Sequence, residues 1–236
     1  MSGVRCNIRL VSSAVPTLGR LEHSNLRDQV RLILRTSIIT GELEPGRLYS
    51  VGSFAERLGV SATPVREAIG DLAHLGLVQI MRNRGFVIPD LDDHDLDEIL
   101  QLRLLLEVPA IESVAGRLSA AEVTACREQV ERCRAAAGSG DLVRFLDADR
   151  AFHLRLIAAL GNGRLVEILG RLRDQTRLYG LRDLAARGEL LTSAEEHESL
   201  LDAVEAGDAG RARREISHHL RHTRGTWAGR VEPGSL

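Results

Sequence analysis

Four side chains in the second half of the chain have the types and the spacing of a metal site. Asp149 and His153 are four residues apart within a helical pattern, so their side chains meet on one face of that helix. His197 and His219 lie on the apolar faces of two later helical patterns, whereas His218 projects roughly 100° away from His219. A carboxylate and three imidazoles at core-facing positions need partners, and one divalent metal ion would satisfy all four.

Such a set of ligands suits zinc, with nickel, manganese and iron as the other candidates. The structural alternative is that each histidine is simply a satisfied core or surface residue, which is the more common role of a single helical histidine. Three histidines and an aspartate could also leave an open coordination position for an activated water, as in a metal-dependent enzyme. No general base or nucleophile motif accompanies the set, which argues against that function.

A second group of polar residues begins a short helix in the first half of the chain. In the stretch LGVSATPVREAI, Gly59 permits a tight turn, and Ser61 or Thr63 caps the helix that follows. Pro64 is tolerated in the first helical turn. Arg66 then projects from the exposed start of the helix, where an arginine can pair with guanine or hold a phosphate. The pattern indicates a helix that lies against DNA, unless Arg66 is an ordinary solvated residue.

A charged hairpin follows this helix. Two short apolar runs, 77–80 and 86–88, are typical of strands around the turn RNRG. The turn consists of Arg82, Asn83, Arg84 and Gly85. It would form a wing tip that reaches a groove or the backbone of DNA, the alternative being a merely polar turn.

The elements that must position these residues follow from the periodicity. A helical stripe begins at Asn25, and a second helix is expected over 51–58. The stripe of the first helix is Leu26, Val30, Ile33, Leu34 and Ile38, and the buried face of the third helix is Val65, Ala68, Ile69 and Leu72. Three helices followed by a two-stranded hairpin form a winged helix-turn-helix, which we predict for residues 24–90.

Every pattern after the acidic stretch DLDDHDLDE is helical. Helices are expected near 92–117, 119–137, 140–160, 162–178, 193–206 and 208–227, separated by glycine-containing or polar joints. About six helices of this kind form a compact bundle. The sequence therefore predicts a mainly α protein with an all-α bundle at 91–230 and tails at 1–23 and 231–236.

Composition limits the class of protein. Of the 236 residues, 44% are hydrophobic and 27% are charged, which suffices for globular domains. No apolar run approaches the roughly 18 residues of a membrane span, so no membrane partner is expected. All 31 basic residues are arginines. Residues 1–90 contain 11 of them and 8 acidic residues, and the resulting net positive charge is compatible with a nucleic-acid-binding domain. Cys6, Cys126 and Cys133 form no CxxC pair, which favours buried thiols in a reducing cytoplasm.

The first half of the chain resembles the DNA-binding domain of the GntR family of transcriptional regulators. The resemblance rests on ITGELEPG, FAERLGVSATPVREAIGDLAHLGLV and RNRGFVI, in this order over residues 24–90. It implies a homodimer with Thr63 and Arg66 on operator DNA and Arg84 with Gly85 at the wing. Family members commonly have arginine at the position of Ala62, so operator preference or affinity is altered here; one bidentate contact is worth about 1–3 kcal/mol.

The second half resembles the FCD effector domain of the FadR-like branch of this family, over residues 95–225. The segments concerned are EILQLRLLLEVPAIESVAGR, DADRAFHLRLIAALGN, EEHESLLDAVEAGD and ISHHL. The resemblance implies that Asp149, His153, His197 and His219 hold the metal, and that a small carboxylic acid binds beside it and an arginine. Arg103 matches that arginine, the alternative being an ion pair with Glu107, four residues on; Arg150, Arg155 and Tyr179 are further candidates for the effector pocket.

These features predict a DNA-binding transcriptional regulator, most simply a repressor, that responds to a small carboxylic acid. The competing hypotheses are a metal-dependent enzyme and a DNA-binding protein whose bundle is purely structural. A metal measurement and an effector titration distinguish them.

Overall fold

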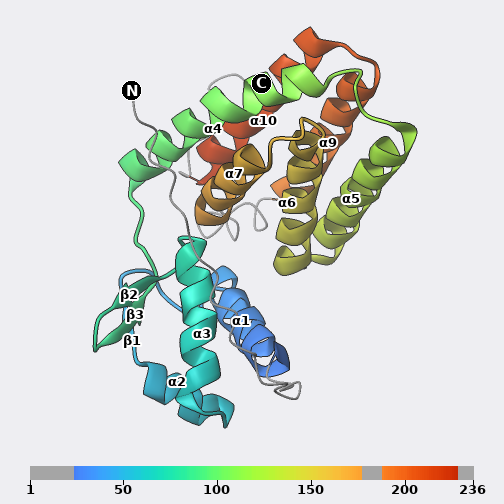
Figure 1. The fold of residues 1–236 in the computed structure, drawn as a ribbon. Coiled ribbons are helices and arrows are strands. Elements are labelled where there is room, and N and C mark those ends of the chain that lie inside the picture. Colours follow the sequence, from blue (N-terminus) through green and yellow to red (C-terminus); the bar gives the residue numbers. More distant parts are fainter. Residues whose placement is uncertain (1–23, 177–187, 228–236) are drawn as a thin grey trace, which may run out of the picture.

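The computed structural model describes residues 24–176 and 188–227, which form two bodies joined by an extended segment (Figure 1). Cys6, Tyr179 and the two predicted tails lie outside the described residues. Within the described ranges, no helix combines the length and the apolar character needed to cross a membrane.

The N-terminal body contains three helices, α1 (Ser24–Ile39), α2 (Val51–Leu58) and α3 (Ala62–His74). Gly59 ends α2 in a left-handed conformation with φ 65°, and Ser61 follows as the N-cap of α3, which confirms the predicted tight turn. The predicted apolar face of α3 is fully buried. On α1 the prediction is partly wrong, because Leu26 and Ile33 are 41% and 43% exposed while the rest of the stripe is buried.

A three-stranded antiparallel sheet completes this body, in the order β1-β3-β2. Its strands are β1 (Leu48–Tyr49), β2 (Gln79–Met81) and β3 (Gly85–Val87). The sequence predicted only the hairpin of β2 and β3, because two residues are too few for a strand pattern. Gly85 is required where β3 meets β1, since a Cβ at this position would lie 1.9 Å from the Tyr49 carbonyl oxygen.

The C-terminal body contains six described helices, near the six predicted positions. They are α4 (Asp93–Val114), α5 (Ala120–Ser139), α6 (Leu142–Ala158), α7 (Gly163–Thr176), α9 (Glu189–Glu205) and α10 (Ala209–Trp227). Capping boxes begin α4 at Asp92 and α5 at Ser119. Cys126 and Cys133 are buried free thiols, as predicted, and burial raises the pKa of Cys126 to about 11.

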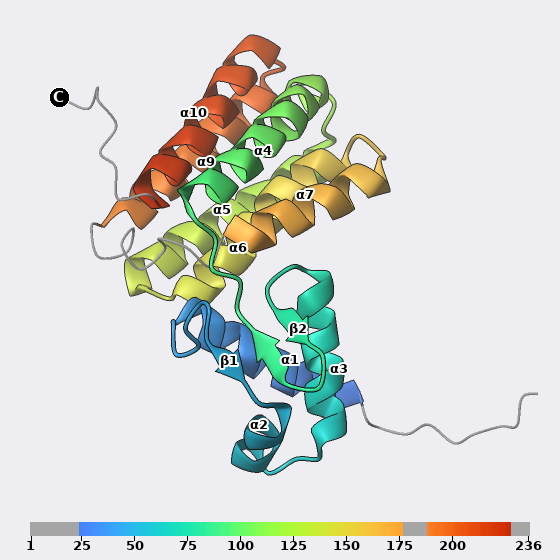
Figure 2. The same ribbon diagram turned by 90° about the vertical axis from the view of Figure 1, so that its left-hand side faces the viewer.

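The two bodies meet where α1 contacts α6 and where Gly76, after α3, lies against Gln175 of α7; Figure 2 shows α1 and α3 below the bundle. Ile39 of α1 packs in one apolar cluster with Phe145 and Leu146 of α6. On the same helices, Arg35 Nη2 lies 2.5 Å from Asp147 Oδ1. The N-terminal body is therefore attached to the helix that carries two of the predicted metal ligands.

Candidate metal centre and DNA-binding face

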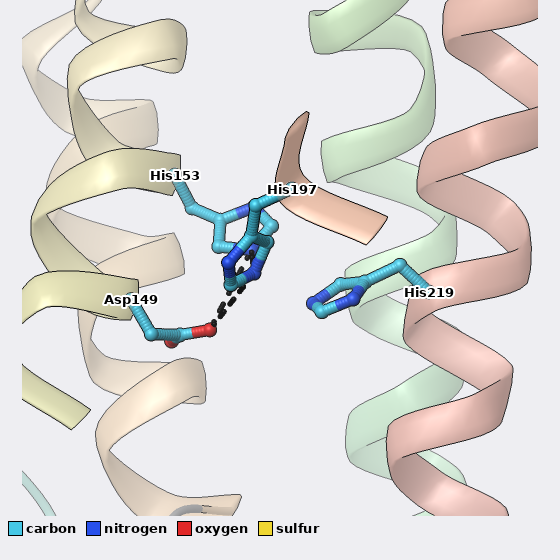
Figure 3. A group of neighbouring side chains, drawn as sticks. All are labelled: Asp149, His153, His197 and His219. Atoms are coloured by element: carbon cyan, nitrogen blue, oxygen red, sulfur yellow. Dashed lines mark hydrogen bonds and ion pairs between the residues drawn. The ribbon is translucent and has the colours of Figure 1, made fainter. Parts of the chain in front are cut away.

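The structure brings the four predicted metal ligands together from three helices (Figure 3). Asp149 and His153 come from α6, His197 from α9 and His219 from α10. Each contributes a donor atom, and these four atoms lie within 4.8 Å of one another. Residues up to 70 positions apart in sequence thus face one small volume inside the bundle.

The donor atoms have the separations that a metal ion requires. His153 Nε2 lies 3.1 Å from His197 Nε2, and Asp149 Oδ1 lies 3.2 Å from His197 Nε2 and 3.7 Å from His153 Nε2. A tetrahedral zinc ion with bonds of about 2.0–2.1 Å places its ligand atoms about 3.3 Å apart. The three distances among Asp149, His153 and His197 bracket this value, and all four donor atoms, His219 included, lie within 4.8 Å of one another.

The charge state of the imidazoles also suits metal binding. His153 and His197 are fully buried, and burial holds the pKa of His153 well below its usual value, with the nearby charge of Arg173 acting in the same direction. Burial likewise lowers the pKa of His197, against the opposing effect of Asp149. Both rings are therefore neutral at neutral pH, and only a neutral imidazole offers a lone pair to a metal.

Two buried arginines and a buried glutamate lie next to the four ligands. Glu107 accepts hydrogen bonds from Arg103 Nε at 2.6 Å and from Arg173 Nη1 at 2.8 Å. Burial alone would raise the pKa of Glu107, but these two guanidinium groups lower it, so the residue is a carboxylate. Arg103 therefore forms the ion pair with Glu107 that we considered as the alternative to an effector contact.

The sequence analysis did not identify Arg173 as a site residue, although its spacing from an apolar residue of the same helix indicates a core-facing position. It is 2% exposed on α7, four residues after the buried Leu169, so it occupies a core-facing position. Its Nη2 atom lies 3.6 Å from Asp149 Oδ2. Arg173 thus joins the Glu107 pair to a predicted metal ligand.

Arg150 and Arg155, two of the arginines predicted to bind the effector, point away from the four proposed metal ligands. Arg150 binds Asp174 of α7 through bonds of 2.9 and 3.1 Å, and Arg155 is exposed. Each residue of a helix is turned by about 100° from the one before, so Arg150 points away from Asp149 and Arg155 points away from His153. The prediction that they line the effector pocket is therefore not supported by their positions, and Tyr179 lies outside the described residues.

The predicted DNA contacts of α3 face solvent. Ser61, Thr63 and Arg66 are exposed and Pro64 is half-buried. Ser61 caps α3 by its backbone position without a side-chain hydrogen bond, which leaves its hydroxyl group available to a partner. The prediction that the start of α3 is open to DNA is consistent with this arrangement.

The wing lies beside the same helix. Arg82, Asn83 and Arg84 are exposed, and Asn83 adopts φ 60° in the turn that leads into Gly85. Arg66 lines a surface depression of about 420 Å³ together with Asn83, Arg84 and Gly85. The recognition helix and the wing therefore form one concave face.

Of the five described arginines elsewhere in the N-terminal body, four form ion pairs, and Arg57 lies over the ring of Phe54. Arg27 pairs with Asp71, and Arg47 pairs with Glu44. Arg66, Arg82 and Arg84, by contrast, form no ion pair with any residue that the structure describes. The unpaired guanidinium groups are concentrated where a phosphate backbone would lie.

Each of the two bodies matches a known protein family. Residues 26–88 match the family "Bacterial regulatory proteins, gntR family", and residues 98–222 match the FCD domain. The chain is 32% identical over 208 residues to the "Probable D-xylose utilization operon transcriptional repressor" of Paenarthrobacter nicotinovorans, covering 86% of this chain and 89% of that protein. It is 29% identical over 196 residues to the HTH-type transcriptional regulator McbR of Escherichia coli, covering 82% and 89%. The solved structure of E. coli McbR superposes with a TM-score of 0.72 at 26% identity, over 86% of this chain and 97% of that chain.

Proposed function

The chain belongs to the GntR family of bacterial regulatory proteins and carries an FCD domain, and from this membership we propose that it is a metal-dependent, acid-responsive regulator. The family makes the chain a DNA-binding transcriptional regulator and not an enzyme. The proposal goes beyond family membership in three respects: the protein binds a metal ion, it binds a carboxylic-acid effector, and it forms a homodimer. The relative described as a repressor suggests repression as the direction of control.

The observation that carries the proposal is the convergence of Asp149, His153, His197 and His219. One carboxylate and three imidazoles suit zinc, with nickel, manganese or iron as alternatives. When bound, the ion would supply a Lewis-acidic position for a carboxylate ligand. Asp149, 13% exposed, is the most accessible member and lies on the side from which Arg173 approaches.

The charges around the site favour an anionic effector. Arg103 and Arg173 contribute two positive charges, and Glu107, Asp149 and Glu196 (which contacts His219) contribute three negative charges, so the group carries one net negative charge without a metal ion. A divalent ion would change this to one net positive charge in a region of low dielectric constant, where an uncompensated charge is costly. A small carboxylic acid would offset this charge, with Arg103 and Arg173 as its nearest guanidinium groups.

Two contacts connect this site to the DNA-binding body. On α6, Asp147 binds Arg35 of α1 and lies two residues before Asp149. On α7, the amide of Gln175 lies against Gly76, after α3, and follows Arg173 by two residues. An effector that draws Asp149 and Arg173 together would shift both helices beneath the winged domain, provided that it binds one arrangement more tightly than the other.

On the DNA side, Arg66 and the wing residues would contact the operator. Helix-turn-helix proteins bind as dimers to two half-sites about one helical turn apart, so a homodimer would double these contacts. A change in the angle between bundle and winged domain would then alter the spacing of the two recognition helices.

The His197→Ala variant tests the metal and effector parts together. Full-length protein is stripped of metal and titrated with zinc while its melting temperature and operator affinity are recorded. Zinc at about 100 times its dissociation constant stabilises the folded state by about 2.7 kcal/mol. We expect His197→Ala to lose this stabilisation and the response to carboxylic acids, yet still to bind operator DNA.

His94→Ala is the matched control, because its side chain is 80% exposed on α4. It should behave like the wild type throughout. If zinc stabilises His197→Ala as much as the wild type, the metal lies elsewhere. If no acid that binds changes operator affinity, the bundle is a structural unit and the regulatory part of the proposal is wrong.

A further inference from the structure

A carboxylate behind the metal ligands has no role in the function proposed above. Glu196 lies on α9, directly before His197, and its side chain reaches α10. Its Oε2 atom is 2.8 Å from His219 Nδ1, and its Oε1 atom is 2.6 Å from His222 Nδ1. Glu196 thus joins a predicted metal ligand to a second histidine one turn further along α10.

His219 differs in this respect from the other two histidines of the cluster. The Nδ1 atoms of His153 and His197 are buried and have no hydrogen-bond partner among the described residues. The nearest carboxylate oxygen to His153 Nδ1 is Oε2 of Glu107 at 4.0 Å, which is beyond hydrogen-bond distance. Only His219, of the three rings, is therefore held from behind by a carboxylate.

The hydrogen bond determines which nitrogen of His219 carries the proton. Each oxygen of the Glu196 carboxylate faces an imidazole nitrogen, Oε2 facing Nδ1 of His219 and Oε1 facing Nδ1 of His222. An ionised carboxylate only accepts hydrogen bonds, so Nδ1 of His219 must be the protonated nitrogen. The lone pair is then on Nε2, at the far side of the ring, and Figure 3 shows that ring directed toward the other three side chains.

We propose that Glu196 is a positioning residue of the metal centre, which fixes the tautomer and the ring orientation of His219 so that Nε2 faces the ion. This inference rests on the metal site proposed above. Carboxylates that accept the second N–H of a metal-bound imidazole also raise its basicity, and their loss typically weakens metal affinity about 10- to 100-fold.

His222 supports the carboxylate in the same arrangement. Its side chain is 21% exposed and donates to the oxygen that His219 does not use. With both oxygens engaged, the Glu196 carboxylate cannot rotate freely behind His219. His218 Nδ1, at 3.5 Å from Oε1, lies at the outer edge of the group.

The competing interpretation is that Glu196 is only an ion-pair link between α9 and α10. The two interpretations differ in what Glu196→Ala does to His219. A structural link predicts lower thermal stability with an unchanged tautomer and unchanged zinc affinity. A positioning role predicts a shift of His219 toward the Nε2–H tautomer and weaker zinc binding.

The experiment uses the full-length protein, the variants Glu196→Ala and Glu196→Gln, and Glu195→Gln as a control. Glu195 is the neighbouring, exposed glutamate on α9. The tautomer of His219 is read in metal-free protein from long-range nitrogen-15 spectra of the imidazoles. Zinc affinity is measured by competition with a chelator of known strength.

We expect Glu196→Ala to bind zinc about 10- to 100-fold more weakly and to lose the Nδ1–H tautomer. Glu196→Gln retains an acceptor oxygen, so it should fall between Glu196→Ala and the wild type, and Glu195→Gln should match the wild type. An unchanged tautomer in both Glu196 variants would overturn the inference. If the tautomer shifts but wild-type protein binds no zinc, the positioning role stands and the proposed metal function fails.

Discussion

Acidification of the metal-free protein is expected to destabilise the bundle through His153. This side chain is fully buried, and its pKa is held well below the usual value by burial and by the charge of Arg173. The unfolded chain therefore binds a proton on His153 at a pH at which the folded chain does not. A depressed pKa of this kind contributes stability that is complete above the unfolded pKa and is lost as the pH falls toward the folded value.

The size of the effect follows from this linkage. A histidine with an unfolded pKa of about 6.5 that remains neutral in the folded state costs about 2 kcal/mol between pH 7 and pH 5. His197, which is also buried with a lowered pKa, acts in the same direction. Carboxylates contribute further at the acidic end, so the contribution of His153 must be taken as a difference between two proteins.

Urea unfolding in the presence of a chelator, repeated at several pH values between 5 and 7, measures this difference. The free energy of unfolding of His153→Gln should fall by about 2 kcal/mol less than that of the wild type over this range, because glutamine does not titrate. His94→Gln is the control, since that side chain is 80% exposed and should leave the pH dependence unchanged. Parallel curves for the wild type and His153→Gln would refute the reasoning, because His153 would then bind its proton equally in both states.

Three further predictions concern other parts of the chain. Glu107→Gln removes the carboxylate that two buried arginines share, so the free energy of unfolding in urea should drop by about 3–5 kcal/mol; a drop below about 1 kcal/mol would contradict this. Gly85→Ala should disrupt the pairing of β3 with β1 and weaken operator binding, because its Cβ would lie 1.9 Å from the Tyr49 oxygen at φ 134°; normal operator affinity would show that the wing adapts. Arg66→Ala should cost about 1–3 kcal/mol of operator affinity in a gel-shift titration if Arg66 reads a base, whereas Arg27→Ala, which removes an arginine paired with Asp71, should cost much less.

Local sequence patterns predicted most of the secondary structure. The bounds of α2 agree with the prediction because Gly59 and the polar residues before Val51 delimit a short apolar stripe. The bundle helices were found near their predicted positions because each has the period of a helix and a polar or glycine-containing joint. The same approach failed for β1, because Leu48 and Tyr49 become a strand only by pairing with β3.

Burial was predicted less well than helicity. Leu26 and Ile33 fit the period of α1, yet they are exposed. A stripe of apolar residues identifies the side of a helix that can be buried, but the width of the buried face depends on what packs against it. On α4, the apolar Leu102 is likewise 46% exposed, although it directly precedes the buried Arg103.

The sequence by itself determined the local chemistry of this protein. It established the pairing of Asp149 with His153 on one helix, because four residues make slightly more than one turn. It also placed Arg66 at the start of α3 and put His197 and His219 on the apolar faces of two later helices, and the resemblance to the FCD domain implied that these histidines bind one metal ion with Asp149 and His153. Each of these results depends on spacing within one element or on a recognised motif.

Only the tertiary structure decided which other groups reach the centre. Arg173 and Glu196 come from α7 and α9, and their contacts with Asp149 and His219 depend on how these helices pack against α6 and α10. The angle and the depth at which two helices pack are set by all the side chains between them, and no spacing along a single segment encodes them. The proposed ligands could therefore be named from the sequence, whereas the charges and hydrogen bonds around them could be identified only in the folded bundle.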